Sequence, residues 1–135
     1  MRRSYRLITL AAIMAVLMSA MSFGAELVMH TKHTLYIGMN DGDTGEQVYS
    51  MAEARKIFNE IAIKYVDGYT LYEADGFWRE GENVSSEHTL VCVIDGASDE
   101  AVKGIMDEAL KAFNQHSILL EFSETNSLFY DGKTE

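Results

Sequence analysis

The sequence contains one cysteine and no proline. A single cysteine excludes an intramolecular disulfide, so we expect the fold to be held together by its apolar core. Cys92 lies within the apolar run Leu90–Ile94, a setting that favours a buried, inert thiol over a reactive nucleophile. The chain also lacks the G-x-S-x-G element of serine hydrolases and the phosphate-binding pattern G-x-x-x-x-G-K-[ST]. Nucleophilic catalysis and P-loop nucleotide binding therefore find no support.

Basic residues are scarce, with 11 Lys and Arg against 21 Asp and Glu and a formal net charge of −10. Nucleic acids and anionic membranes are bound by clustered Lys and Arg side chains. We therefore expect neither as a partner.

Two segments contain residue types that bind metal ions, but neither predicts a complete site. His30 and His33 are three residues apart, a spacing that suits a helix, whereas this region precedes a strand and is expected to be frayed. The loop Asn40–Glu46 resembles the start of a calcium-binding loop, yet its ligand pattern fails after Asp43. We expect no bound metal and no cofactor, with a divalent-cation binder that uses the acidic loops as an alternative.

The start of the chain has the order of charge, apolar run and small residues that is typical of a secretory signal. Arg2, Arg3 and Arg6 precede the uncharged run Leu7–Met18, and small residues follow up to Ala25. A membrane anchor is the alternative, but the uncharged run is barely long enough to span a bilayer. We expect residues 1–24 to be a cleaved signal peptide, with cleavage after Ser22 or Gly24. The mature protein is then periplasmic or extracellular, with no membrane association.

Hydrophobic periodicity and capping residues predict two helices and several short strands in the rest of the chain. Ser50 and Glu53 form a capping box at the start of the first helix, and Gly68 is expected to end it. Ser98 is expected to cap the second helix. The expected strands span residues 34–39, 69–73, 77–79, 88–94 and 117–122, with a turn at Asp75-Gly76 and a polar loop over 81–86.

The resulting order is β-α-β-β-α-β. It predicts an α+β fold, the ferredoxin-like two-layer sandwich, in which both helices cover one face of an antiparallel sheet. We expect one such domain over residues 33–131, with the Thr34 and His88 strands in the centre of the sheet. The helices are expected to bury Ile57, Phe58, Ile61, Ile105, Met106 and Leu110 beneath the sheet.

Four segments of the chain resemble a known family; they are LYIG at 35–38, VDGYT at 66–70, ADGFWR at 74–79, and Glu87 before a hydrophobic strand. On these residues the chain resembles the DUF3574 family of small, often exported bacterial proteins without an assigned function. The resemblance extends from Thr34 to Asp131 and implies no enzyme class. Met39 and Ser86 stand where this family usually has arginines, so any role of those arginines is not expected here.

The sheet face opposite the helices is the candidate functional surface, because the third main strand is apolar on both sides and helices can cover only one. Alternation places Leu35, Ile37 and Met39 toward the core, together with the side chains of Ile118, Leu120 and Phe122. The candidate ligand or interface residues on the open face and its rim are Tyr36, Gly38, Trp78, Arg79, Glu87, His88, Leu119 and Glu121.

The composition and motifs favour a non-catalytic exported domain that binds a partner or itself, as a homodimer, through this open face. A small molecule, or the apolar segment Leu128–Tyr130, are alternative occupants of the face. A further alternative is an enzyme similar to the ferredoxin-like monooxygenases, with His88 or Tyr36 as proton donor. No acid–base pair is evident in the sequence, so no catalytic residue is assigned.

Overall fold

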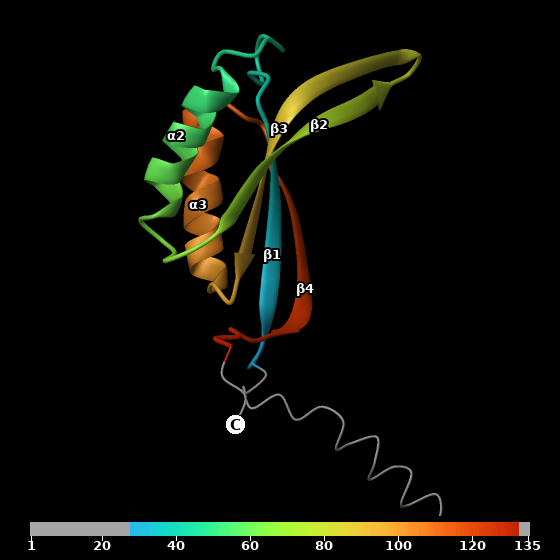
Figure 1. Cartoon of the computed structure of the whole chain (residues 1–135). Coiled ribbons are helices and arrows are strands. Elements are labelled where there is room, and N and C mark those ends of the chain that lie inside the picture. The colour runs from blue at the N-terminus through green and yellow to red at the C-terminus, as the bar shows by residue number, and fades with distance from the viewer. Residues whose placement is uncertain (1–27, 133–135) are drawn as a thin grey trace, which may run out of the picture. The chain divides into compact units, whose positions relative to one another are not determined.

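The computed structural model describes residues 28–132, so the predicted signal peptide lies outside the described residues. The chain separates into two units; residues 30–125 form the larger one, and the described residues 28–29 and 126–132 belong to the other. The larger unit contains nearly all of the regular structure (Figure 1). The elements are β1 (Val28–Gly38), α2 (Met51–Ala62), β2 (Thr70–Glu80), β3 (Asn83–Asp95), α3 (Asp99–Ala112) and β4 (Leu119–Ser127).

The predicted ferredoxin-like sandwich is confirmed. The four strands form one antiparallel sheet in the order β2-β3-β1-β4, and α2 and α3 lie together on one side of it (Figure 1). The strands that contain Thr34 and His88 are the central pair, as expected. Neither α2 nor α3 therefore covers the other face of the sheet.

The start of each helix agrees with the sequence, whereas the end of the first helix does not. Ser50 caps α2 through a complete capping box with Glu53, and the Ser98 side chain accepts from the Ala101 N–H at the start of α3. The expectation that Gly68 ends the first helix is wrong. The helix ends at Ala62 because the next backbone N–H groups turn back to Ile61 and Ala62, six residues before that glycine.

The predicted turn at Asp75-Gly76 and the predicted loop over 81–86 are also wrong. Asp75 pairs with His88 and Gly76 with Glu87 in the middle of the β2–β3 ladder. The chain reverses instead at Gly81, whose φ of +62° matches a two-residue hairpin with glycine at its first central position. Residues 81–86 are mostly polar because the end of this hairpin projects beyond the helices, so both of its faces meet solvent (Figure 1).

The core lies between the sheet and the two helices. Leu35, Ile37 and Met39 are buried there as predicted, against helix side chains that include Phe58, Ile61 and Ile105. The predicted Ile57 and Met106 are partly buried and pack against this core, and Leu110 is half-buried. Ile118 and Leu120 also pack against it, but Phe122 is 74 % exposed, because β4 is the edge strand of the sheet.

Cys92 is fully buried in this core, as its apolar run predicted. Burial raises the pKa of its thiol to about 12, because the charged thiolate would lose its hydration there. The thiol is therefore inert in the folded protein.

Candidate functional site

The open face of the sheet carries a row of large side chains across its three adjacent strands. Tyr36 of β1 and Tyr72 of β2 stand opposite Val91 of β3, one on each side. Although Val91 points away from the helices, it is only 1 % exposed. The two tyrosines thus shield much of the apolar surface that the sequence suggested would need a separate cover.

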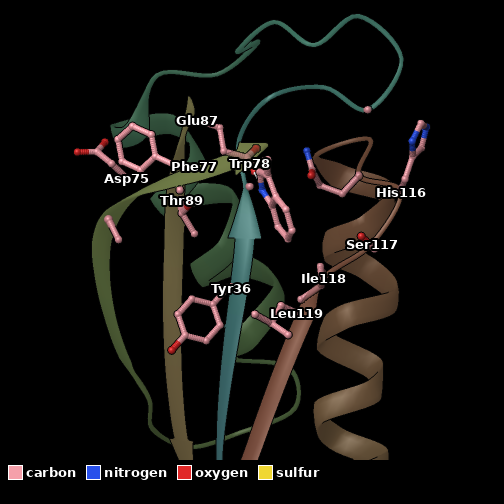
Figure 2. A pocket seen from close by; sticks show the side chains of 15 residues that line it. Tyr36, Asp75, Phe77, Trp78, Glu87, Thr89, His116, Ser117, Ile118 and Leu119 are labelled. Carbon is pink, nitrogen blue, oxygen red and sulfur yellow. Dashed lines mark hydrogen bonds between the residues drawn. The ribbon is translucent and has the colours of Figure 1, made fainter. Parts of the chain in front are cut away.

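Above this row the open face is hollowed into a pocket of about 680 Å³. Its floor is made by strand residues that include Gly38, Ala74, Gly76 and Thr89, and its far wall is the segment 115–119 that leads into β4. Figure 2 shows the pocket with Trp78 and Glu87 at its upper end and Tyr36 below. The volume is in the range of small-molecule sites, about 300–1,000 Å³.

Glu87 lies over a glycine that makes room for it. A Cβ at Gly38 would come within 2.2 Å of the Glu87 Oε2 atom, so only glycine at this position leaves the carboxylate where it is. The Glu87 side chain is half-buried there. Its Oε2 atom accepts a long hydrogen bond of 3.4 Å from the backbone N–H of Asn40.

Trp78 forms a hydrogen bond with the same carboxylate. The indole Nε1–H donates to Glu87 Oε1 at 3.1 Å, which sets the orientation of the ring although the side chain is 62 % exposed. The ring reaches down from Glu87 toward Leu119 and Ile118 on the far wall (Figure 2). A second glycine on β2, Gly76, leaves room for the Thr89 side chain on the neighbouring strand. A Cβ at Gly76 would lie 2.9 Å from Thr89 Oγ1.

The far wall is held by a network between the loop after β1 and the residues that follow α3. The Asn114 side-chain amide donates to Asp41 and to Asp43, both at 2.9 Å, and His116 Nε2 lies 3.2 Å from Asp43 Oδ1. Asn114 itself adopts the left-handed φ of 47° at which a helix commonly ends. The hydrogen bond from Asn114, followed by that from the Thr44 backbone N–H, lowers the pKa of Asp41 to about 2.

Gly42 and Gln115 bring this loop against the pocket. A Cβ at Gly42 would lie 2.8 Å from the Asn114 carbonyl oxygen, which accepts the Gly42 N–H. Gln115 donates from its side-chain amide to the Asn40 carbonyl. Asn40 in turn contacts Glu87, so the far wall and the carboxylate are positioned by one connected set of bonds.

Below the pocket, the Tyr36 hydroxyl donates to Glu121 Oε2 at 3.0 Å. This hydrogen bond, with burial of the hydroxyl second, raises the pKa of Tyr36 above its usual value. A raised pKa keeps the phenol protonated, so Tyr36 is a poor general base at neutral pH.

The structure brings five of the eight predicted site residues together in the pocket: Tyr36, Gly38, Trp78, Glu87 and Leu119. It does not bring the other three there. Arg79 and His88 are one residue away from Trp78 and Glu87, so alternation turns them to the opposite face. Arg79 donates to the Gly81 carbonyl, His88 pairs with Asp75 at 3.0 Å, and Glu121 lies below the pocket beside Tyr36.

Several lining residues were not predicted. Thr89 follows Glu87 at a spacing of two, so strand alternation alone could have placed it on the open face. Gly76 was assigned to a turn, which hid its position on the floor. The segment 115–118 gives no such signal, because its place against the sheet depends on the contacts of Asn114 and His116 with a loop some 70 residues earlier.

The histidines do not form a metal centre. The expectation of a frayed segment around His30 and His33 is wrong, because both lie in β1, where residues three apart project to opposite faces. His33 is buried with its Nε2 atom 3.3 Å from Asp99, and His30 pairs with Asp95 at 3.7 Å. Among residues 28–132 no three His, Cys, Asp or Glu side chains gather in a way that could hold a metal ion. Neither helix in that range is long and apolar enough to cross a membrane.

Solved structures with a similar fold include a phage SAM lyase. Its complex with S-methyl-5′-thioadenosine has a TM-score of 0.56 and 16 % identity, covering 78 % of this chain and 93 % of that one. The same lyase in its apo state has a TM-score of 0.51 and 20 % identity, covering 79 % and 94 %. A DUF3240 family protein from Shewanella baltica has a TM-score of 0.42 and 10 % identity, covering 78 % and 97 %. At these identities the likeness to the lyase concerns the fold alone.

No match was found among the curated proteins. The profile of one family, described as a protein of unknown function, matches residues 32–129, which is most of the chain. This range contains both helices, all of β2 and β3, and every residue that lines the pocket. The chain therefore belongs to the DUF3574 family.

Proposed function

We propose that this protein is an exported, non-catalytic domain that binds a small organic molecule in the pocket on its open sheet face. The observation that carries the proposal is the exposed indole of Trp78, which is fastened to the half-buried carboxylate of Glu87 above a glycine floor. An exposed aromatic ring that is held in place beside a hollow loses little conformational entropy when it contacts a ligand. Apolar walls with a few converging polar groups are the usual composition of such sites.

A non-catalytic role is supported by the positions of the groups that could transfer protons. Asp75 is at the edge of the pocket, but its partner His88 is not among the lining residues, and both side chains are exposed. The Tyr36 hydroxyl is committed to Glu121 and has a raised pKa. Among the described residues, no acid and base that both line the pocket are paired with each other.

Self-association through the same face is the second candidate. It is favoured by the exposed apolar surface of Leu119 and Tyr72 on the open face. It is the weaker candidate because Tyr36 and Tyr72 already flank and shield Val91.

The first test is the native mass of the secreted protein, purified without refolding. We expect a monomer that retains a bound small molecule, or one that binds candidates from a panel that includes S-methyl-5′-thioadenosine. Trp78 is the only tryptophan in the chain, so its fluorescence reports on the pocket directly. Binding should change this fluorescence and saturate.

Gly38→Ala and Gly68→Ala form a matched pair for the same test. A Cβ at Gly38 displaces the end of the flexible Glu87 side chain, whereas a Cβ at Gly68 meets nothing within 4 Å. We expect Gly38→Ala to fold but to lose ligand binding, and Gly68→Ala to bind normally. A dimer without ligand would overturn the proposal in favour of self-association, and Tyr36→Asp with Leu119→Asp should then give a folded monomer. A monomer that binds nothing would also contradict it, and would leave residues 128–130 as the cover to test by truncation after Thr125.

A further inference from the structure

Among the described residues, no lysine, arginine or histidine side chain forms an ion pair with Glu87. All ion pairs found among the described residues involve carboxylates other than Glu87. Within residues 28–132, no lysine or arginine lines the pocket, and the lining imidazole of His116 is paired with Asp43. The fixed charge at the upper end of the pocket is therefore negative.

The carboxylate also keeps unused hydrogen-bonding capacity. An ionised carboxylate can accept about four hydrogen bonds. Glu87 accepts one at each oxygen, from the Trp78 indole and, at 3.4 Å, from the Asn40 backbone. Two acceptor positions remain for a donor that enters the pocket.

An aromatic ring lies beside the place where such a donor would sit. The Trp78 ring is next to Glu87, and Tyr36 lines the pocket below it (Figure 2). The face of an indole attracts a cation within about 6 Å, and a nearby carboxylate adds to that attraction. A carboxylate that accepts a hydrogen bond from an indole in the same hollow suits an organic cation.

One part of the remaining lining is apolar, beside polar residues that include Thr89, Gln115 and Ser117. Leu119 and Ile118 face Trp78 across the pocket, and Ala74 lies on the floor. These residues suit the carbon skeleton of a ligand and offer nothing to an anionic group. The net charge of −10 on the chain also favours the approach of cations over anions.

We infer that the ligand of this pocket carries an ammonium-type group, which Glu87 binds beside the Trp78 ring while its apolar body lies against Leu119 and Ile118. This inference rests on the proposed function and names the chemical class of its ligand. A neutral metabolite with the same body binds more weakly, and an anionic one is excluded.

The test compares three probes that share one aromatic body: 2-phenylethylamine, 2-phenylethanol and 3-phenylpropionate. Binding is followed by the Trp78 fluorescence of the mature protein and by the indole N–H resonance of the same residue. Because hydrogen bonds to charged groups contribute about 1.5–3 kcal/mol, we expect the amine to bind roughly 10- to 100-fold more tightly than the alcohol. No saturable binding is expected for the carboxylate.

Glu87→Gln and Glu82→Gln provide the matched variants, since Glu82 is an exposed carboxylate at the tip of the same hairpin, away from the pocket. We expect Glu87→Gln to remove the preference for the amine and leave the alcohol unchanged, and Glu82→Gln to do neither. Circular dichroism checks that both variants fold. Equal binding of amine and alcohol, tighter binding of the carboxylate, or no response to any probe would overturn the inference. The proposed function fails separately, when the native protein neither retains nor binds any member of the broader panel.

Discussion

At the scale of single residues, Asp41 shows how the wall of the pocket is stabilised. Its carboxylate accepts from the Asn114 side chain and from the backbone N–H groups of Asp43 and Thr44. These bonds favour the ionised form and lower its pKa from 3.8 to about 2. Folding is therefore favoured by Asp41 at pH values above 3.8, and this contribution is lost as the pH falls toward 2.

Replacing Asp41 with alanine should accordingly lower the melting temperature at neutral pH, and the difference from the unmodified protein should shrink as the pH falls from about 4 to 2. Thermal denaturation followed by circular dichroism at a series of pH values measures this. Asp67→Ala is the control, because Asp67 is an exposed carboxylate of the same unit. A difference for Asp41→Ala that stays constant down to pH 2 would show that its bonds do not depend on the charge.

At the scale of elements, α2 packs against the sheet through residues of the core. Phe58 is fully buried there, and its ring meets Tyr69 edge to face with centroids 5.8 Å apart. Phe122 on β4 is the same residue type but mostly exposed.

Phe58→Ala should therefore lower the free energy of unfolding by about 3–5 kcal/mol, because it leaves a cavity in the core. Phe122→Ala should change it by less than about 0.5 kcal/mol. Urea denaturation of both variants gives the comparison. Similar values for the two would mean that α2 does not cover the sheet as described.

The same scale shows what the sequence can and cannot predict about the fold. Ser50, Glu53 and Ser98 act through neighbours three residues away, so their helix starts are readable locally. Gly76 sits after an aspartate, a pair that usually marks a turn, and only its pairing with Glu87 keeps it in a strand. The stretch after Gly81 is mostly polar because both faces of the hairpin are exposed there. A strand that is exposed on both faces has the same sequence pattern as a loop.

The site was predictable to the extent that strand alternation describes it. Alternation placed Tyr36 and Gly38 on the open face, and both line the pocket. The contact between Trp78 and Glu87 could not be predicted, because it requires the register of a hairpin whose turn was assigned to the wrong residues. The far wall depends on contacts between distant loops, which leave no local pattern.

At the scale of the whole molecule, the expected export stays a prediction. When the full chain is produced in a bacterial host, the mature protein should be found outside the cytoplasm, with its first residue between Phe23 and Glu26. Mass analysis of the purified protein determines this terminus. A variant with Leu10→Arg, which puts a charge into the apolar run, should remain as unprocessed precursor. Membrane-bound protein that still begins at Met1 would contradict the prediction.

The buried thiol of Cys92, in the centre of the sheet, can be used to measure how often the core opens. Cys92 is on β3, between two other strands, and its thiol is both inaccessible and protonated in the native state. A thiol-specific reagent can therefore modify it only during excursions in which the sheet parts from the helices. Where reclosure is faster than modification, the labelling rate measures the free energy of that opening under fully native conditions. Any ligand that binds the folded chain alone would slow the labelling by mass action, so a molecule on the far side of the sheet could be detected through a sulfur atom that it never touches.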